Sequence, residues 1–378
     1  MRRLVLLTAA VLVAGVFLLG YGFSGRNQAA VPVVIPTVVD QVREALAARY
    51  YRPVPAQVLR LGSVDAMLTA LRDPYTQYLP HADYRRLQEE LAGRYVGIGI
   101  SVAVSRRGLA VTAVRPGPAQ AAGIRVGDTI VRIGSRPTAL HPHRALTCID
   151  GLPGTRVLIE VLRPRRVLWV SVVRARLRSP DVQGRLLAYA GRRWGDLVVS
   201  AFAADTAPRL GREIDLLQRR GAAGFVLDLR GDPGGLLDEA VAVASLFLDR
   251  GSVVSLRGLH RRPVLYDVLG GVATRLPLVV LVDHGTASSA EVVAAALRDH
   301  RRATLVGART YGKALVQAVA PLGDGGALEL TVAHYYTADG ADISGVGIVP
   351  DVRAVDRPGT ATDEALAAAL EVLARPTT

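Results

Sequence analysis

Short apolar runs alternate with longer amphipathic stretches over residues 178–375 of this 378-residue chain. Apolar runs of about four to eight residues are typical of buried strands, whereas apolar positions three or four apart predict helices. We expect strands over 197–200, 225–229, 278–282, 303–306 and 328–334. We expect helices over 206–219, 236–248 and 289–299. Strands and helices that alternate in this way indicate an α/β layered fold.

The chain before this region is predicted to be helical. Val39, Val42 and Leu46 follow the i, i+3, i+7 spacing of an amphipathic helix, and the pattern continues to about residue 86. The preceding residues, 26–36, have the composition of a linker.

The N-terminus carries a membrane signal. Arg2 and Arg3 precede an apolar run from Leu4 to Phe23, and about 20 residues can just span a bilayer core. The two arginines predict that the N-terminal end stays in the cytoplasm. We predict an uncleaved signal anchor in residues 1–25, with a removed signal peptide as the alternative. Both place the bulk of the chain outside the cytoplasm, in the cell envelope.

The net charge and the amino-acid composition limit the kinds of molecule that this protein is expected to bind. The net charge of +13 suggests an anionic partner, but aromatic residues make up only 5% of the chain, too few for stacking platforms that bind single strands. We therefore expect no nucleic-acid partner, and attraction to anionic lipid instead. Cys148 is the single cysteine, so no intrachain disulfide can form. His141 and His143 form a loop pair without the further ligands of a metal site.

Lys313 is the only lysine among the 46 lysine and arginine residues. Arginine replaces lysine in ion pairs, but its pKa above about 12 prevents it from acting as a base. A lysine can act as a base once burial lowers its pKa toward the working pH. The neighbours Ala314, Leu315 and Val316 are apolar. A single lysine in such surroundings is a candidate for a reaction that needs a neutral amine.

Three segments, 226–235, 283–293 and 307–317, together resemble the carboxyl-terminal-processing serine peptidases, which use a Ser–Lys dyad. The family's Thr-Ala-Ser-x-x-Glu pattern selects Ser288, and its Arg-Thr-x-Gly-Lys pattern selects Lys313, 25 residues later (313 − 288). The resemblance makes Ser288 the nucleophile, Lys313 the base and Gln317 the residue that supports the lysine. If residues 313–317 are helical, Lys313 and Gln317 lie on one face.

Ser288 also fits a structural role. Ser-x-x-Glu before an apolar run is a capping box, so Ser288 can cap the helix predicted over 289–299. The two roles are compatible, because a helix N-terminus also offers free N–H groups and a positive dipole end. Ser289 is a competing nucleophile, since the order Ser-Ser-Ala departs from the family's usual Ser-Ala-Ser. His284, four residues earlier, is interpreted as a loop residue.

The resemblance also implies an oxyanion hole. The N–H groups of Gly234 and Ser289 are its expected donors, and two such donors stabilise developing charge by a few kcal/mol each. The turn that contains Gly234 lacks the Gly-Lys-Ser/Thr ending of a phosphate loop, so nucleotide binding is not expected. No metal or cofactor is implied.

Residues 94–176 resemble a PDZ domain. Residues 95–100 match the family's carboxylate-binding loop and following strand, and 117–133 match its Gly-x-Pro-Ala…Gly-Asp run. Backbone N–H groups in a Gly-rich turn form a nest for a carboxylate, and an open strand edge accepts an extended peptide. The expected peptide-binding residues are Gly97, Ile98, Gly99 and Ile100.

The predicted organisation is a signal segment (1–25), a linker and helical segment (26–93), an inserted PDZ domain (94–176) and a crotonase-like α/β peptidase core (177–378). We expect an extracytoplasmic serine endopeptidase, tethered to the membrane, that recognises free protein C-termini and forms an acyl-enzyme. A homo-oligomer is compatible with this prediction. Two alternatives stay open: a catalytically silent PDZ scaffold that binds peptide tails, and a crotonase-like acyl-CoA enzyme, which the export signal opposes.

Overall fold

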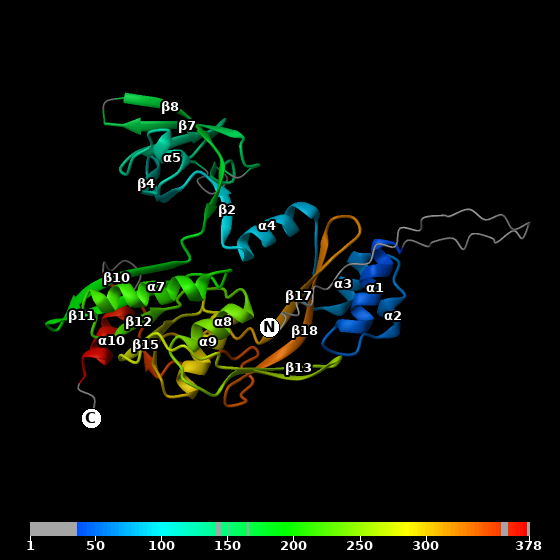
Figure 1. Cartoon of the computed structure of the whole chain (residues 1–378). Helices are drawn as coiled ribbons and strands as arrows, with labels where there is room; N and C mark the ends of the chain where they lie inside the picture. The colour runs from blue at the N-terminus through cyan, green and yellow to red at the C-terminus, as the bar shows by residue number, and fades with distance from the viewer. Residues whose placement is uncertain (1–35, 141–144, 150, 165, 357–361, 376–378) are drawn as a thin grey trace, which may run out of the picture. The chain divides into compact units, whose positions relative to one another are not determined.

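The computed structural model describes residues 36–140, 145–149, 151–164, 166–356 and 362–375 (Figure 1). The predicted anchor at 1–25 and the histidine pair His141 and His143 lie outside these residues. Within them, no helix is long and apolar enough to cross a membrane.

The core is a six-stranded sheet with the order β10-β11-β12-β15-β16-β19. Only the β10–β11 pair is antiparallel; the other neighbours run parallel. The strands are β10 (Val182–Tyr189), β11 (Arg192–Val199), β12 (Phe225–Asp228), β15 (Leu278–Val282), β16 (Thr304–Gly307) and β19 (Val352–Arg353).

Helices cover both faces of this sheet. Successive strand residues point to opposite sides, so apolar side chains of one strand pack against both helix layers. Leu227, Val280 and Leu305 face one layer, which holds α7 (Thr206–Arg219), α8 (Leu237–Ser245) and α9 (Ser289–Asp299). Val226 and Val279 pack with the opposite layer, formed by α10 (Glu364–Ala374). The predicted bounds of α7, α9 and β15 agree with the structure, and the layered α/β fold is confirmed.

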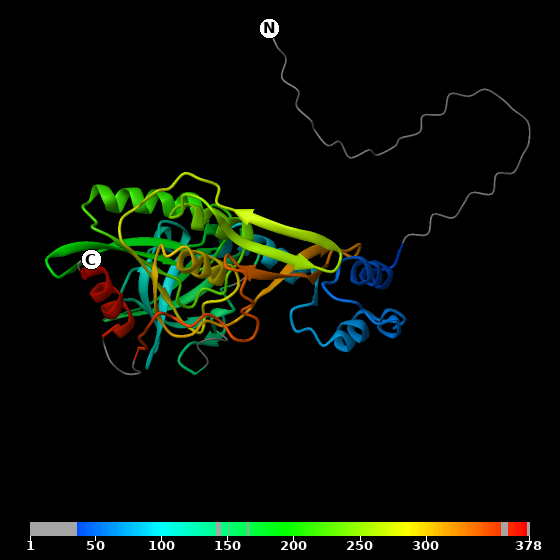
Figure 2. The same cartoon turned by 90° about the horizontal axis from the view of Figure 1, so that it is seen from below.

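A second sheet stands beside the core. Its strands are β1 (Gln77–Leu79), β13 (Ser252–Gly258), β14 (Arg261–Asp267), β17 (Leu315–Pro321) and β18 (Ala327–Thr337). β18 pairs with β1, β13 and β17, and β13 continues to β14 (Figure 2).

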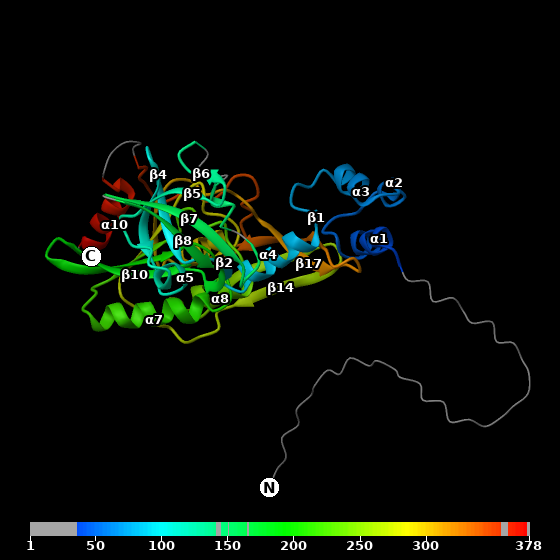
Figure 3. The same cartoon turned by 90° about the horizontal axis from the view of Figure 1, so that it is seen from above.

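The N-terminal segment packs on this second sheet. It consists of α1 (Val38–Arg49), α2 (Ala56–Leu59), α3 (Val64–Leu71) and α4 (His81–Leu91). Val42 and Leu46 of α1 and Met67 of α3 bury their side chains with Leu328 and Leu330 of β18. Figure 3 shows α1 and α3 at the end of the second sheet that carries β1.

The PDZ-like segment is a separate small sheet, ordered β3-β4-β5-β7-β8, with β6 paired to β5 and a two-stranded β2–β9 ribbon next to it. Its elements are β2 (Arg94–Gly97), β3 (Ile100–Ser105), β4 (Gly108–Val114), α5 (Pro118–Ala121), β5 (Thr129–Ile133), β6 (Arg136–Pro137), β7 (Arg156–Arg163), β8 (Arg166–Val173) and β9 (Ala175–Arg178). β3 ends the sheet order, so one of its edges is open as far as the described residues show.

Candidate active site

Three loops that follow neighbouring parallel strands build the site. They are 229–236 after β12, 283–288 after β15 and 308–314 after β16. The carboxyl ends of parallel strands meet at one edge of a sheet, which is where α/β proteins place their sites. Backbone hydrogen bonds join the loops: Ala287 N–H donates to Asp232 O at 2.9 Å, and Tyr311 N–H donates to Thr286 O at 3.0 Å.

Ser288 lies at the N-terminus of α9 in an unusual conformation, with φ 55° and ψ −119°. A positive φ is uncommon for a residue other than glycine and is concentrated at functional sites. Ser288 and Glu291 form the predicted capping box. The hydroxyl of Tyr335 donates to the Ser288 carbonyl at 3.2 Å, which fixes the turn further.

The competing candidate, Ser289, is 3% exposed. Its Oγ donates to the carbonyl oxygen of Gly235 at 2.9 Å. The Ser289 hydroxyl is therefore committed to the loop after β12, and Ser288 is the better placed nucleophile.

Glu291 joins Ser288 to the loop that carries Lys313. Its carboxylate is fully buried and accepts four hydrogen bonds. The donors are the Ser288 N–H (2.9 Å), the Lys313 N–H (2.9 Å), the Gly312 N–H (2.8 Å) and the Thr310 hydroxyl (2.5 Å). Backbone on both sides of the site is thus held by one charged group, and charge-assisted hydrogen bonds are the strong ones. The sequence marked Glu291 as a spacing reference and as part of a capping box, but not as a group that binds the loop of Lys313.

Lys313 is largely buried, and burial lowers the pKa of its ammonium group. Negative charge on Glu329, together with Tyr311 and Asp73, opposes this shift. Lys313 Nζ lies 5.0 Å from the ring centroid of Tyr75, a cation–π distance. Among the described residues, no hydrogen bond joins Lys313 Nζ to Ser288 Oγ.

Tyr75 comes from the N-terminal segment, directly before β1. Burial, followed by a hydrogen bond with Tyr311, raises the pKa of Tyr75 to about 12, so its ring stays neutral. Asp73 fixes this turn by accepting from the Tyr75 N–H (3.0 Å) and the Tyr50 hydroxyl (3.1 Å). The N-terminal segment therefore contributes Tyr75 to the surroundings of the Lys313 ammonium group.

Ser288, Ser289, Lys313 and Gln317 line one cavity of about 250 Å³. The rest of its wall is mostly apolar, formed by Leu87, Leu91, Pro233, Gly235, Leu236, Leu237, Val292, Leu315, Val316 and Val319, together with Glu329 and Tyr335. Three loops and a strand thus meet around a space that can hold a short extended peptide.

The helical relation considered for Lys313 and Gln317 is wrong. Residues 315–321 form β17, which pairs with β18, and a register shift lies between Val316 and Gln317. The Gln317 side chain nevertheless reaches the cavity, and its Nε2 is buried without a hydrogen-bond partner among the described residues. A buried unsatisfied donor is costly, so Gln317 is poised to hold a group that enters the cavity.

Gly234 approaches Ser288 closely. Its φ is +99°, and a Cβ atom at this position would lie 2.8 Å from Ser288 Cβ and 2.9 Å from Ser289 N. Only glycine fits such an approach. The N–H of Gly234 donates to Asp232 Oδ1 at 2.8 Å.

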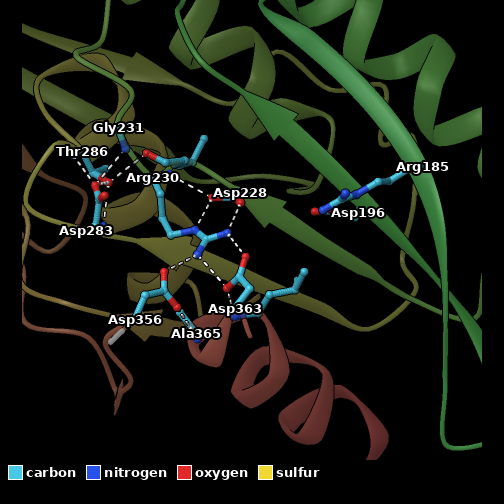
Figure 4. Close-up of polar contacts among 12 residues, drawn as sticks. Arg185, Asp196, Asp228, Arg230, Gly231, Asp283, Thr286, Asp356, Asp363 and Ala365 are labelled. Atoms are coloured by element: carbon cyan, nitrogen blue, oxygen red, sulfur yellow. Dashed lines mark hydrogen bonds and ion pairs between the residues drawn. The ribbon is translucent and has the colours of Figure 1, made fainter. Parts of the chain in front are cut away.

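Arg230 ties the loop after β12 to the C-terminal part of the chain (Figure 4). Its guanidinium donates to Asp228 (2.7 Å), Asp363 (2.9 Å) and Asp356 (3.1 Å). Burial alone would lower the pKa of Arg230, but the hydrogen bonds to Asp228 and Asp363 outweigh it and raise this pKa. Asp363 is also the N-cap of α10, so α10 and the glycine loop are fixed together.

The PDZ-like loop adopts a tight turn between β2 and β3. Gly99 has φ +85°, a left-handed conformation that favours glycine. The carbonyl oxygens of Ile98 and Gly99 accept from Ala119 N–H and Arg115 N–H at 2.9 Å each. Gly97 ends β2 and Ile100 begins β3, so the four predicted peptide-binding residues are contiguous at the open edge strand.

His284 is exposed, and its ring centroid lies 5.9 Å from that of Tyr311. Within the described ranges, no group of three or more His, Cys, Asp or Glu residues is arranged to hold a metal ion.

Comparison with known proteins agrees with this geometry. Residues 193–354 match the model of peptidase family S41, and residues 110–163 match a PDZ domain model. The carboxy-terminal-processing protease of Bartonella bacilliformis is 33% identical over 330 residues, covering 83% of this chain and 74% of the relative. The carboxy-terminal processing protease CtpA of Bacillus subtilis is 31% identical over 332 residues, covering 84% of this chain and 68% of the relative.

Solved structures give the same result. The photosystem II D1 C-terminal processing protease superposes with a TM-score of 0.55 at 28% identity, covering 84% of this chain and 92% of that chain. The fold and the serine at its helix N-terminus thus define a serine-type peptidase with a PDZ domain. The chain belongs to peptidase family S41, and its curated relatives are carboxy-terminal-processing proteases.

Glu291 provides a first prediction. Glu291→Gln keeps the side-chain size but replaces one acceptor oxygen by an amide donor that faces backbone N–H groups. We expect kcat/KM for peptide cleavage to fall about 10- to 100-fold, equivalent to about 1.5–3 kcal/mol. Glu371→Gln, on the exposed side of α10, is the matched control and should keep wild-type activity. Unchanged kcat/KM in Glu291→Gln would show that the carboxylate does not position the site.

Proposed function

We propose that this protein is a Ser–Lys endopeptidase of the cell envelope that recognises the free C-termini of proteins and cleaves them through an acyl-enzyme. The observation that carries the proposal is the shared cavity, which is lined by Ser288 and by the single lysine, a partly buried side chain with a lowered pKa. A neutral amine in this cavity can take the proton of a serine hydroxyl, which activates the serine as a nucleophile.

The steps assign each residue a role. Neutral Lys313 moves away from the Tyr75 ring and takes the proton of Ser288 Oγ. Ser288 Oγ then attacks the peptide carbonyl carbon. The Gly234 N–H, once released from Asp232 Oδ1, and the Ser289 N–H stabilise the oxyanion, and Lys313 returns its proton to the leaving amine. Water then hydrolyses the ester by the same route. Gln317 positions Lys313, a role supported by its buried and unpartnered Nε2.

The PDZ domain is proposed to hold the substrate's terminal carboxylate at Gly97–Ile100. Support comes from the open edge of β3, along which a peptide can add as a further strand. The boundaries 94–176 for this domain and 177–378 for the peptidase core are part of the proposal, as are the crotonase-like description of the core and self-association.

We also propose that the protein is held at the membrane. The apolar run at Leu4–Phe23 behind two arginines supports a membrane tether with the catalytic part outside the cytoplasm. A silent PDZ scaffold would have no need for a buried lysine beside a serine at a helix N-terminus. An acyl-CoA enzyme would need intracellular substrates, which the export signal opposes.

Cleavage of paired peptides tests the proposal. A peptide with a free C-terminal carboxylate should be cleaved with kcat/KM about 10- to 100-fold higher than its C-terminal amide, because the amide loses charge-assisted hydrogen bonds to the PDZ loop. The same peptide acetylated at its N-terminus is the matched control and should behave like the free acid. Equal turnover of acid and amide would contradict carboxylate recognition, and no cleavage of either would contradict the peptidase.

A further inference from the structure

Asp232 is a buried carboxyl group next to the oxyanion hole, and the steps above do not use it. Its side chain is 0% exposed. Oδ1 accepts the N–H of Gly234 at 2.8 Å, and its backbone carbonyl accepts the N–H of Ala287 at 2.9 Å. Asp232 therefore touches both the glycine loop and the residue that precedes Ser288.

The second oxygen of this carboxyl has nothing to bind. Oδ2 of Asp232 is buried without a hydrogen-bond partner in the described part of the chain. The guanidinium of Arg230 donates to Asp228, Asp356 and Asp363 instead (Figure 4). An ionised carboxylate needs several donors or a cation when it is removed from water. This site offers one N–H.

The other charged groups around Asp232 do not help its ionised form. Asp181 directly precedes β10 and is a second buried carboxyl group. Its negative charge opposes ionisation of Asp232. Arg209 of α7 lies 3.9 Å from Asp181, and its charge is directed there. On the nucleophile side, Glu291 is held by its own four donors, and Asp283 accepts from Gly231 N–H at 2.8 Å.

The balance favours a protonated carboxyl group. Burial raises the pKa of Asp232 to about 8, Asp181 contributes in the same direction, and the hydrogen bond from Gly234 N–H opposes both. The neutral form accepts that N–H only weakly through one oxygen. The ionised form holds it strongly and adds a negative charge beside the oxyanion.

We propose that Asp232 is a positioning residue that supports the oxyanion donor Gly234 while its carboxyl group is protonated, and that its ionised form disables the oxyanion hole. The geometry carries this inference: one carboxyl group holds the N–H that the oxyanion needs, and it does so within reach of Ser288 and Ser289. The inference rests on the proposed peptidase function.

The test compares pH profiles of kcat for peptide cleavage by the wild type and Asp232→Asn. Asparagine keeps an oxygen that accepts from Gly234 N–H but cannot ionise. The wild type should lose activity as pH rises through about 8, and this falling limb should be absent in Asp232→Asn. At pH 9 the carboxyl group would be about 90% ionised, so the variant should exceed the wild type about tenfold. Asp215→Asn, an exposed carboxylate on α7, is the matched control and should keep the wild-type profile.

Other outcomes are equally decisive. Coincident profiles for the wild type and Asp232→Asn would overturn the inference and leave the peptidase intact, because a purely structural turn residue would not change the falling limb. If Asp232→Asn does not fold, phosphorylation of Ser288 by diisopropyl fluorophosphate in the wild type decides, a reaction in which Ser288 Oγ bonds to phosphorus and fluoride leaves. Its rate must fall above about pH 8 while the circular dichroism spectrum stays constant, and a rate that does not fall up to pH 10 overturns the inference. A wild type that neither cleaves peptide nor reacts with the fluorophosphate would overturn the proposed function and this inference with it.

Discussion

Ser288→Ala is expected to lower kcat for peptide cleavage by about 10⁴- to 10⁶-fold, the scale seen when a serine nucleophile is removed. The variant should still fold. Ser288 is also the N-cap of α9, and losing such a cap costs about 1 kcal/mol. Circular dichroism and thermal unfolding should therefore stay close to the wild type, while a fluorophosphonate probe no longer labels the protein.

Ser289→Ala is the matched control, since it removes a neighbouring hydroxyl that the structure commits to the Gly235 carbonyl. It should keep most of the activity, because an oxyanion donor at this position is the backbone N–H, which alanine retains. An inactive Ser289→Ala with an active Ser288→Ala would move the nucleophile by one residue.

The parts of the fold that could be predicted are those set by local pattern. The strand Leu278–Val282 and the helix Ser289–Asp299 are almost entirely buried, so their apolar runs mark their ends clearly. The three site loops could also be predicted to meet, because each follows a buried strand of one parallel sheet. Ser288 and Lys313 lie on one cavity for this reason.

What could not be predicted depends on pairing between distant segments. Residues 313–317 show no helix because β17 pairs with β18, and the hydrogen bonds of that pairing override any local helical preference. Tyr75 contacts Lys313 across a sequence separation of 238 residues (313 − 75). Arg230 binds Asp363 over 133 residues. No periodic pattern in the chain indicates such contacts.

Glu291 shows how one motif can carry two roles. The Ser-x-x-Glu pattern predicts a capping box, and the structure has it. The same carboxylate also binds the N–H groups of Gly312 and Lys313, which local sequence does not reveal. The helix cap and the placement of the base are therefore the same interaction.

Lys313→Arg is expected to be as inactive as Lys313→Ala, with kcat reduced about 10²- to 10⁴-fold or more, the contribution usual for a general base. Arginine keeps the positive charge and most of the length of lysine. Its guanidinium cannot lose a proton at any ordinary pH, so it cannot accept the proton of Ser288. This substitution separates a base from a structural cation, because a lysine that only pairs with Glu329 or stacks on Tyr75 would tolerate arginine at a cost of about 1 kcal/mol or less.

The pH dependence of the wild type gives a second readout. Burial lowers the pKa of Lys313, so its neutral form is populated at lower pH than for an exposed lysine, and activity should rise as pH increases through that lowered pKa. This measurement is best made in Asp232→Asn, because the falling limb expected from ionisation of Asp232 is then absent from the pH profile. Lys313→Arg should show no rising limb, since its guanidinium stays protonated over the whole pH range. Substantial cleavage by Lys313→Arg, with a rising limb like that of the wild type, would rule out Lys313 as the base and transfer that role to another group around the cavity.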